Sequence, residues 1–146
     1  MRADISNVRR AVCTIANEYI KQGCNRSEAF IKAWIVTKNN ITLRVSGVTF
    51  DNRQAALAYL AKFRPSDLQT VLKRDPNNQY DRNAVKVIVK VPEIKKQAVI
   101  GYIPATLSGG VSKLLDKGLR LKTQPLGVIG GYADKENYGF LLKLAI

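Results

Sequence analysis

Histidine is absent from this sequence of 146 residues, and Cys13 and Cys24 are its only two cysteines. Without histidine, Ser-His-Asp and Cys-His catalysis and the histidine-containing zinc sites of metalloproteases are excluded. Two cysteines alone cannot complete a structural zinc site, and their spacing does not form a C-x-x-C motif. We therefore expect no metal and no cofactor, and we expect both cysteines to be small buried residues in a reducing compartment.

Long apolar stretches are also missing, which bears on where the protein works. No window approaches the roughly 20 apolar residues of a transmembrane helix. Charges at Arg2, Asp4, Arg9 and Arg10 interrupt the segment where a secretory signal peptide would need an apolar run. The sequence therefore predicts a soluble cytoplasmic protein that does not bind membranes and that, in a bacterium, would associate with the nucleoid.

Acidic residues are scarce, with 11 Asp and Glu against 24 Lys and Arg, so the formal net charge is +13. A charge this large attracts polyanions, and a nucleic acid is the partner that it favours. A surplus of charge that serves only solubility is the alternative. Charge alone does not decide between DNA and RNA.

The hydrophobic pattern divides the chain into a helical and a mixed part. Apolar residues at helical spacing predict one helix over residues 5–20 and a second from Ser27 to Asn39, a helical hairpin of unknown role within residues 1–40. From residue 41 the period changes to two. The pattern then predicts strands over 41–50, 68–74, 85–91, 98–103, 119–129 and 138–146, helices over 51–63 and 104–118, and a turn over 130–137.

Short antiparallel strands with two inserted helices favour a small barrel over a wound parallel sheet. The expected fold class is α+β, an OB-like antiparallel β-barrel of about six strands with two inserted helices after the N-terminal helical hairpin. The barrel would occupy residues 41–146 as one domain.

The polar loop over residues 75–82 is the most informative stretch. Asp-Pro-Asn-Asn is a usual turn sequence, but a plain turn does not need the Tyr-Asp-Arg-Asn that follows. Tyr80 offers a flat ring for stacking, Asn78 offers paired donors and acceptors, and Arg82 offers a fork for phosphate. A rigid loop held by its own Asx hydrogen bonds is one alternative. A calcium loop is another, although the EF-hand pattern requires glycine where Tyr80 stands.

At these residues the sequence resembles the HIRAN domain family, over about residues 44–144. The resemblance rests on these segments: Gly47-Val48, the run from Arg74 to Val85, Ile100-Gly101-Tyr102-Ile103-Pro104, the stretch from Leu114 to Gly118, and Ile129-Gly130-Gly131. HIRAN domains are OB-like and occur alone in bacterial and phage proteins, or at the N-terminus of eukaryotic fork-remodelling helicases. The helicase motor has no counterpart in this sequence, and the resemblance suggests a role in DNA repair or replication.

The resemblance implies a non-catalytic module that binds single-stranded DNA and captures its 3′-hydroxyl end. Tyr80 and Phe50 would stack on the terminal bases, Asp81 would hold the 3′-hydroxyl, and Asn78 would contact a base edge. Tyr102 and Tyr138 fall where the family places further ring or polar contacts. The flanking basic residues that complete the predicted site are Lys73, Arg74 and Arg82.

Three positions depart from the pattern of the eukaryotic members. Thr49 replaces a basic residue, which puts a phosphate contact in doubt. Asp51 stands where an aromatic residue would be expected, so one stacking surface is in doubt. Pro104-Ala105 replaces a basic pair.

Two other functions stay open at this point. One is a small metal-dependent nuclease using Asp51, Asp75 and Asp81, which would have to converge on a magnesium ion. The other is a protein-binding adaptor or an inhibitor of a DNA-processing enzyme, whose protein partner the sequence does not identify.

Overall fold

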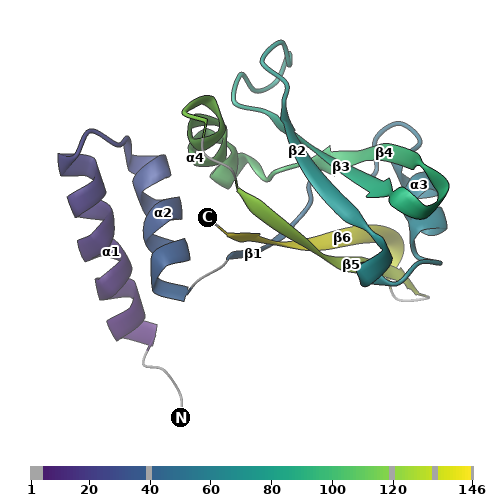
Figure 1. Cartoon of the computed structure of the whole chain (residues 1–146), viewed down its shortest axis with the longest axis horizontal. Helices are drawn as coiled ribbons and strands as arrows, with labels where there is room; N and C mark the ends of the chain where they lie inside the picture. The colour runs from purple at the N-terminus through teal and green to yellow at the C-terminus, as the bar shows by residue number, and fades with distance from the viewer. Residues whose placement is uncertain (1–4, 39–40, 119–120, 133–134, 146) are drawn as a thin grey trace.

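The computed structural model describes residues 5–38, 41–118, 121–132 and 135–145. These residues form four α-helices and six β-strands (Figure 1). The helices are α1 (Ile5–Lys21), α2 (Arg26–Lys38), α3 (Arg53–Leu60) and α4 (Ala105–Asp116). The strands are β1 (Ile41–Arg44), β2 (Gln69–Arg74), β3 (Val85–Val91), β4 (Lys96–Tyr102), β5 (Lys122–Tyr132) and β6 (Lys135–Ala145). Within the same ranges no helix is long and apolar enough to cross a membrane.

The strands form two antiparallel three-stranded sheets, in the orders β1-β6-β5 and β2-β3-β4. The two sheets contact each other at two places. At one of them, Ser46 and Tyr102 exchange backbone hydrogen bonds of 2.8 and 2.9 Å. At the other, where β2 lies beside β5 without a backbone ladder, the Thr70 hydroxyl donates to the Thr123 hydroxyl at 2.6 Å. The α+β class, the six strands and the two inserted helices after a helical hairpin are thus confirmed for the described residues, but the two sheets do not close into one barrel.

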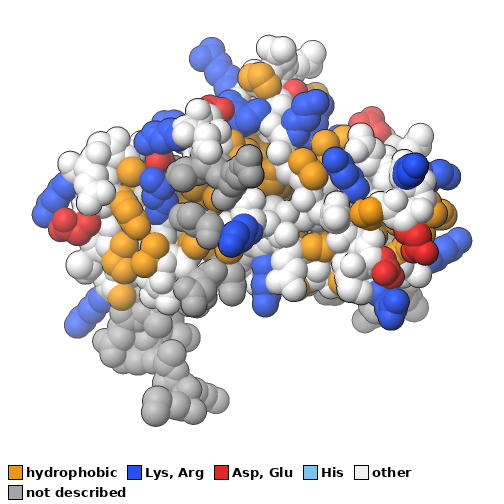
Figure 2. All heavy atoms as spheres, in the orientation of Figure 1, with side chains coloured by type: hydrophobic (Ala, Val, Ile, Leu, Met, Phe, Trp, Pro, Cys, Tyr) orange, Lys and Arg blue, Asp and Glu red, His pale blue; other side chains and the backbone are white. Residues whose placement is uncertain are grey.

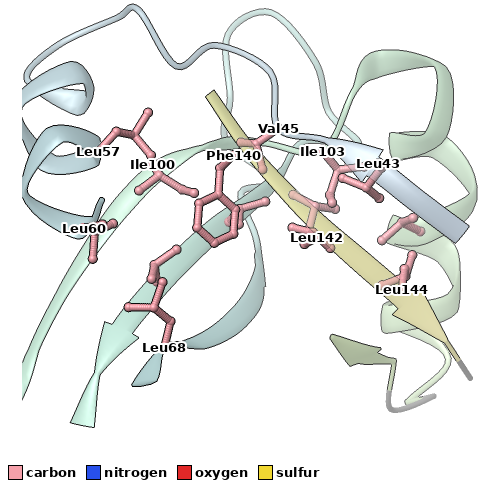
Figure 3. Packing of buried hydrophobic residues seen from close by; sticks show 14 of the residues in the cluster. Leu43, Val45, Leu57, Leu60, Leu68, Ile100, Ile103, Phe140, Leu142 and Leu144 are labelled. Atoms are coloured by element: carbon pink, nitrogen blue, oxygen red, sulfur yellow. The ribbon is translucent and has the colours of Figure 1, made fainter. Parts of the chain in front are cut away.

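The core lies between the two sheets and follows the predicted alternation of β3. Its four valines at odd positions are buried while the residues between them are half-buried, as period-two patterning requires. Phe140 of β6 lies in the middle of this core, between Ile100 of β4 and Leu142 (Figure 3). Burial of these side chains supplies the main driving force for the sheets to pack.

Several expected boundaries differ from the structure. The strand expected over 41–50 ends at Arg44, because Ser46 pairs with Tyr102 instead of continuing the ladder to β6. The helix expected over 51–63 covers only Arg53–Leu60, with Asn52 as its N-cap residue.

The β5–β6 hairpin extends further than predicted. The turn expected over 130–137 falls largely within strands, because a register shift after Gly130 keeps β5 and β6 paired to Tyr132 and Lys135. Part of that expected turn, residues 133–134, lies outside the described residues, as does the expected start of β5 at 119–120. The expectation of buried cysteines is wrong, because the side chain of Cys13 is exposed on α1 and that of Cys24 is only half-buried.

The helical hairpin packs on the rest of the chain through α2 and α4 (Figure 1). The Glu28 carboxylate of α2 is buried and accepts a hydrogen bond from Lys117 at 2.9 Å, with the Lys32 ammonium 3.4 Å away. Burial alone would raise the pKa of Glu28, but the hydrogen bonds and charges of Lys117 and Lys32 together lower it. The carboxylate therefore stays ionised and ties the hairpin to the end of α4.

Two adjacent glycines of α4 test this packing. A Cβ added at Gly110 would collide with the Ile31 side chain and lie 2.7 Å from the Ser27 carbonyl oxygen, whereas one at Gly109 would come no closer than 3.7 Å to Ser27. Alanine in a helix gains about 0.5–1 kcal/mol over glycine, and overpacking costs about 1–3 kcal/mol. Gly109→Ala should therefore raise the free energy of unfolding, and Gly110→Ala should lower it.

The measurement is urea unfolding followed by fluorescence of Trp34, the only tryptophan, which lies on α2. Stabilisation by both substitutions would show that α2 does not rest against α4 at Gly110.

Candidate nucleic-acid interface

A cleft of about 620 Å³ opens beside the polar loop between β2 and β3. Three segments line it, the linker between β1 and α3, the loop between β2 and β3, and the junction of β4 with α4. It contains five of the residues predicted from the sequence, namely Phe50, Asn78, Tyr80, Asp81 and Tyr102. Residues that lie far apart along the chain are therefore brought together in one concave surface.

Two aromatic rings at the cleft are strongly exposed. Tyr80 is 94% exposed and Phe50 is 66% exposed. Neither ring belongs to the hydrophobic core. Exposed aromatic side chains beside a cleft are typical of surfaces that receive a ligand by stacking.

The position of Phe50 depends on a close approach between its linker and β4. A Cβ at Gly101 would collide with the carbonyl oxygen of Ser46, so only glycine lets the linker cross β4 at this point. The crossing brings Phe50 to the same cleft as Tyr80.

Tyr102 lines the cleft and is held on two sides. The Arg53 guanidinium lies 5.2 Å from the centroid of its ring, and its hydroxyl donates to the Asp75 carboxylate at 3.1 Å. Arg53 itself donates to the Gly47 carbonyl at 2.6 Å and lies 3.5 Å from Asp51. Sequence reasoning missed Arg53, although its place at the start of the helix that follows Phe50 was a usable signal.

Asn78 organises the loop from within. Its side-chain oxygen accepts from the backbone N–H groups of Tyr80 and Asp81 at 2.9 and 3.1 Å, and its amide nitrogen donates to Asp75 at 3.2 Å. The hydrogen bond from Asn78 is the main reason that the pKa of Asp75 is lowered, despite partial desolvation, and Tyr102 adds to it. The loop is thus held by its own Asx hydrogen bonds, as one alternative predicted.

Asp81 is fixed by two partners but keeps acceptor capacity. One carboxylate oxygen accepts from the backbone N–H of Asn83 and the other from the Ser108 hydroxyl, each at 2.8 Å. An ionised carboxylate has about four acceptor positions, so those partners leave room for a hydroxyl group of a ligand. Ser108 is buried in α4, and sequence reasoning missed it because nothing local links it to the loop.

The four remaining predicted residues do not line the cleft. Arg74 forms an ion pair with Asp116 at 3.1 Å and donates to the carbonyl of Ala84 at 3.0 Å, so it braces the base of the loop. Lys73 and Arg82 are exposed outside the cleft lining. The ring of Tyr138 packs against the core.

Asn78 gives a prediction about the loop. Asn78→Ala removes the acceptor of two backbone N–H groups, and each lost hydrogen bond costs about 0.5–1.5 kcal/mol. Amide hydrogen exchange at Tyr80 and Asp81 should become faster by about tenfold, since 1.4 kcal/mol corresponds to a factor of ten. Asn77→Ala, at an exposed neighbouring residue, is the control and should change neither of these two exchange rates. Unchanged exchange in Asn78→Ala would mean that the loop is held by other contacts.

Comparison with known proteins gives a family. The HIRAN domain matches the sequence over residues 49–124, a segment that contains Phe50, the polar loop and Tyr102. A crystal structure of a protein from Lactobacillus plantarum is similar, with 23% sequence identity over 73% of this chain and 99% of that chain, and a TM-score of 0.46. No curated protein matches. Since the HIRAN domain, a DNA-binding module, matches more than half of the 146 residues, this chain belongs to the HIRAN domain family.

Proposed function

We propose that this protein binds single-stranded DNA without catalysing a reaction, and that it captures the 3′-hydroxyl end in the cleft beside Tyr80. The observation that carries the proposal is the placement of two exposed rings, Phe50 and Tyr80, in one cleft with the Asp81 carboxylate. Family membership supports DNA as the ligand. The two rings and the carboxylate support the proposal that the cleft binds an unpaired end of the DNA strand.

Exposed rings favour a single strand. In a duplex the faces of the bases are already stacked on one another, whereas an unpaired base can stack on a side chain. Such stacking is worth about 1–3 kcal/mol per base and does not depend on which base is present. Tyr80 and Phe50 would therefore bind the terminal bases of any sequence.

The charge of the cleft favours an end without a terminal phosphate. Its lining holds the carboxylates of Asp51 and Asp81 and one cation, Arg53, so its formal charge is negative although the whole chain carries +13. Lys and Arg side chains are spread over the visible face of the molecule (Figure 2). A 3′-hydroxyl can donate to Asp81, whereas a 3′-phosphate would bring like charge against it.

A nuclease would need carboxylates that converge on a metal ion. Asp75 does not line the cleft, and the described residues contain no group of three or more His, Cys, Asp or Glu side chains that could hold a metal ion. We therefore propose a protein that binds the strand and does not cleave it. Incubation of a labelled strand with the protein and Mg²⁺ or Mn²⁺ tests this part directly, because the strand should stay intact.

The stacking role gives a prediction for Tyr80. Tyr80→Ala should weaken binding of a short oligonucleotide by roughly tenfold or more, from the loss of about 1–3 kcal/mol. Tyr80→Phe keeps the ring face and should change binding little. Fluorescence anisotropy measures both. Tyr59→Ala, at a half-exposed tyrosine of α3 outside this cleft, is the matched control and should bind as the wild type does.

Because the Tyr80 ring is almost fully exposed, none of these Tyr80 variants should unfold earlier than the wild type. Equal losses in Tyr80→Ala and Tyr80→Phe would show that the hydroxyl, rather than the ring, makes the contact.

The end-capture role gives a prediction for Asp81. The wild type should bind a strand with a 3′-hydroxyl more tightly than the same strand with a 3′-phosphate, and a blocked 5′ end should change little. Asp81→Ala should weaken binding of the hydroxyl strand and abolish the preference. Asp81→Asn should keep part of the affinity, because its amide oxygen still accepts a hydrogen bond.

Asp51→Asn is the control for Asp81, since it removes another carboxylate from the same cleft lining. It should keep the preference for the hydroxyl end if that preference comes from a specific hydrogen bond. Equal binding of hydroxyl, phosphate and circular strands by the wild type would reject end capture and leave a general strand-binding surface.

A further inference from the structure

We infer that the seam between α2 and α4 binds the nucleotides next to the captured end, so that the helical hairpin extends the DNA-binding surface beyond the cleft. The inference rests on the proposed binding of a single strand. It concerns α2, which lies outside the segment that matches the HIRAN domain.

The seam is hollowed on both sides of the point where the two helices touch. One hollow of about 310 Å³ is lined by Arg26, Phe30 and Trp34 of α2 and by Thr106 and Leu107 of α4, among others. A second of about 260 Å³ also includes Arg26, together with Asn83 and Lys113. Arg26 therefore stands between two concave surfaces.

Both hollows begin next to the cleft. Ala105 lines the cleft, and the two residues that follow it, Thr106 and Leu107, line the larger hollow. Asn83 lines the smaller hollow, and its backbone N–H donates to Asp81. A strand whose end lies at Asp81 would thus meet the seam as the adjoining surface.

The seam offers the groups that the cleft lacks. The one cation of the cleft lining, Arg53, already contacts Gly47, Asp51 and Tyr102. Arg26 and Lys113 are exposed, and within the described part of the chain neither forms an ion pair, whereas Lys21, Lys32 and Lys117 all do. Unpaired cations attract phosphates without first giving up a carboxylate partner.

An aromatic ring accompanies these cations. Phe30 is 37% exposed on α2 and shares the larger hollow with Arg26. A basic groove combined with rings on which bases stack is the usual arrangement for binding a single strand. DNA of the captured strand is the ligand that this combination fits, because the unpaired cations and the exposed ring lie together beside the proposed end site.

The seam is also rigid before any ligand binds. The close packing at Gly110 and the buried Glu28 between Lys117 and Lys32 fix α2 on α4. Binding across the seam then requires little ordering of the protein, which would otherwise reduce the affinity.

A length series tests the inference. Oligothymidylates of about 3, 6, 9 and 12 nucleotides cover much of the range of about 4–16 nucleotides that such domains occupy. Wild-type affinity should rise about tenfold or more between the shortest and the longest strand, since one further stacked base alone provides that much. Arg26→Ala and Phe30→Ala should remove most of this gain while leaving the shortest strand bound as before.

Salt dependence identifies the contribution of the cations. Each phosphate contact on a single strand contributes about −0.7 to the slope of log affinity against log salt. Arg26→Ala and Lys113→Ala should each make the slope shallower by about that amount for the longest strand and should not change it for the shortest. Gly110→Ala, which displaces α2 from α4, should also reduce the gain with length.

Two substitutions on the same hairpin serve as matched controls. Lys21→Ala removes one positive charge from an exposed lysine of α1, and Val36→Ala shortens an exposed apolar side chain of α2. Both should keep the full length dependence. The inference would be overturned if wild-type affinity did not rise with length, if Arg26→Ala weakened short and long strands equally, or if Lys21→Ala acted like Arg26→Ala.

The same series separates this inference from end capture. A rise with length that is lost in Arg26→Ala, in a protein without preference for a 3′-hydroxyl, would support the seam and reject end capture. A preference for the 3′-hydroxyl without any gain with length would do the reverse.

Discussion

The candidate site depends on the hydrogen bond from the Ser108 hydroxyl of α4 to the Asp81 carboxylate of the loop between β2 and β3. It attaches the loop that carries Tyr80 to α4, and α4 in turn carries the helical hairpin through Gly110 and Lys117. Ser108 is buried in α4 and Asp81 is half-buried, so this bond fixes the carboxylate from the side of the core and leaves its other side open to the cleft. One helix, α4, therefore carries residues of both the cleft and the hollows between α2 and α4.

The loop itself shows how stability and binding are divided among its residues. Asn78 and the Tyr102 hydroxyl both donate to the Asp75 carboxylate, and Asn78 also accepts from the backbone N–H of Tyr80. These hydrogen bonds hold the backbone of the loop. Tyr80 takes no part in them through its side chain, and its ring points into solvent with 94% of its surface exposed. A ring held on a rigid backbone loses little freedom when a base stacks on it, which favours binding.

The fold could be predicted from the sequence where the pattern was local. The alternating valines of β3 and the turn-forming residues before them indicated a strand and a loop, and both are present. The end of β1 could not be predicted, because Ser46 pairs with a residue of β4 that lies 56 positions away in the chain. The contact between Thr70 of β2 and Thr123 of β5, which links the two sheets, likewise has no local signal in the sequence.

The site divides in the same way. Tyr80, Asp81 and Tyr102 belong to segments that carry the family resemblance, and they meet Phe50 in one cleft. Arg74 belongs to the same segment as Tyr80 and Asp81, but it forms an ion pair with Asp116 of α4 and supports the structure instead. The sequence of the segment does not indicate this ion pair. Ser108 and Arg53 were missed because their importance comes from partners brought near by the fold.

The whole chain and the lining of the cleft carry net charges of opposite sign. A net charge of +13 attracts any polyanion, so it supplies affinity but cannot position an end. The cleft lining, with Asp51 and Asp81 against Arg53, has a negative formal charge, which disfavours an added phosphate there. A strand held by cations outside the cleft, such as Arg26 and Lys113, would therefore place in the cleft the part of itself that carries no phosphate. A terminus with a free 3′-hydroxyl is such a part, and it fits the end capture that we propose.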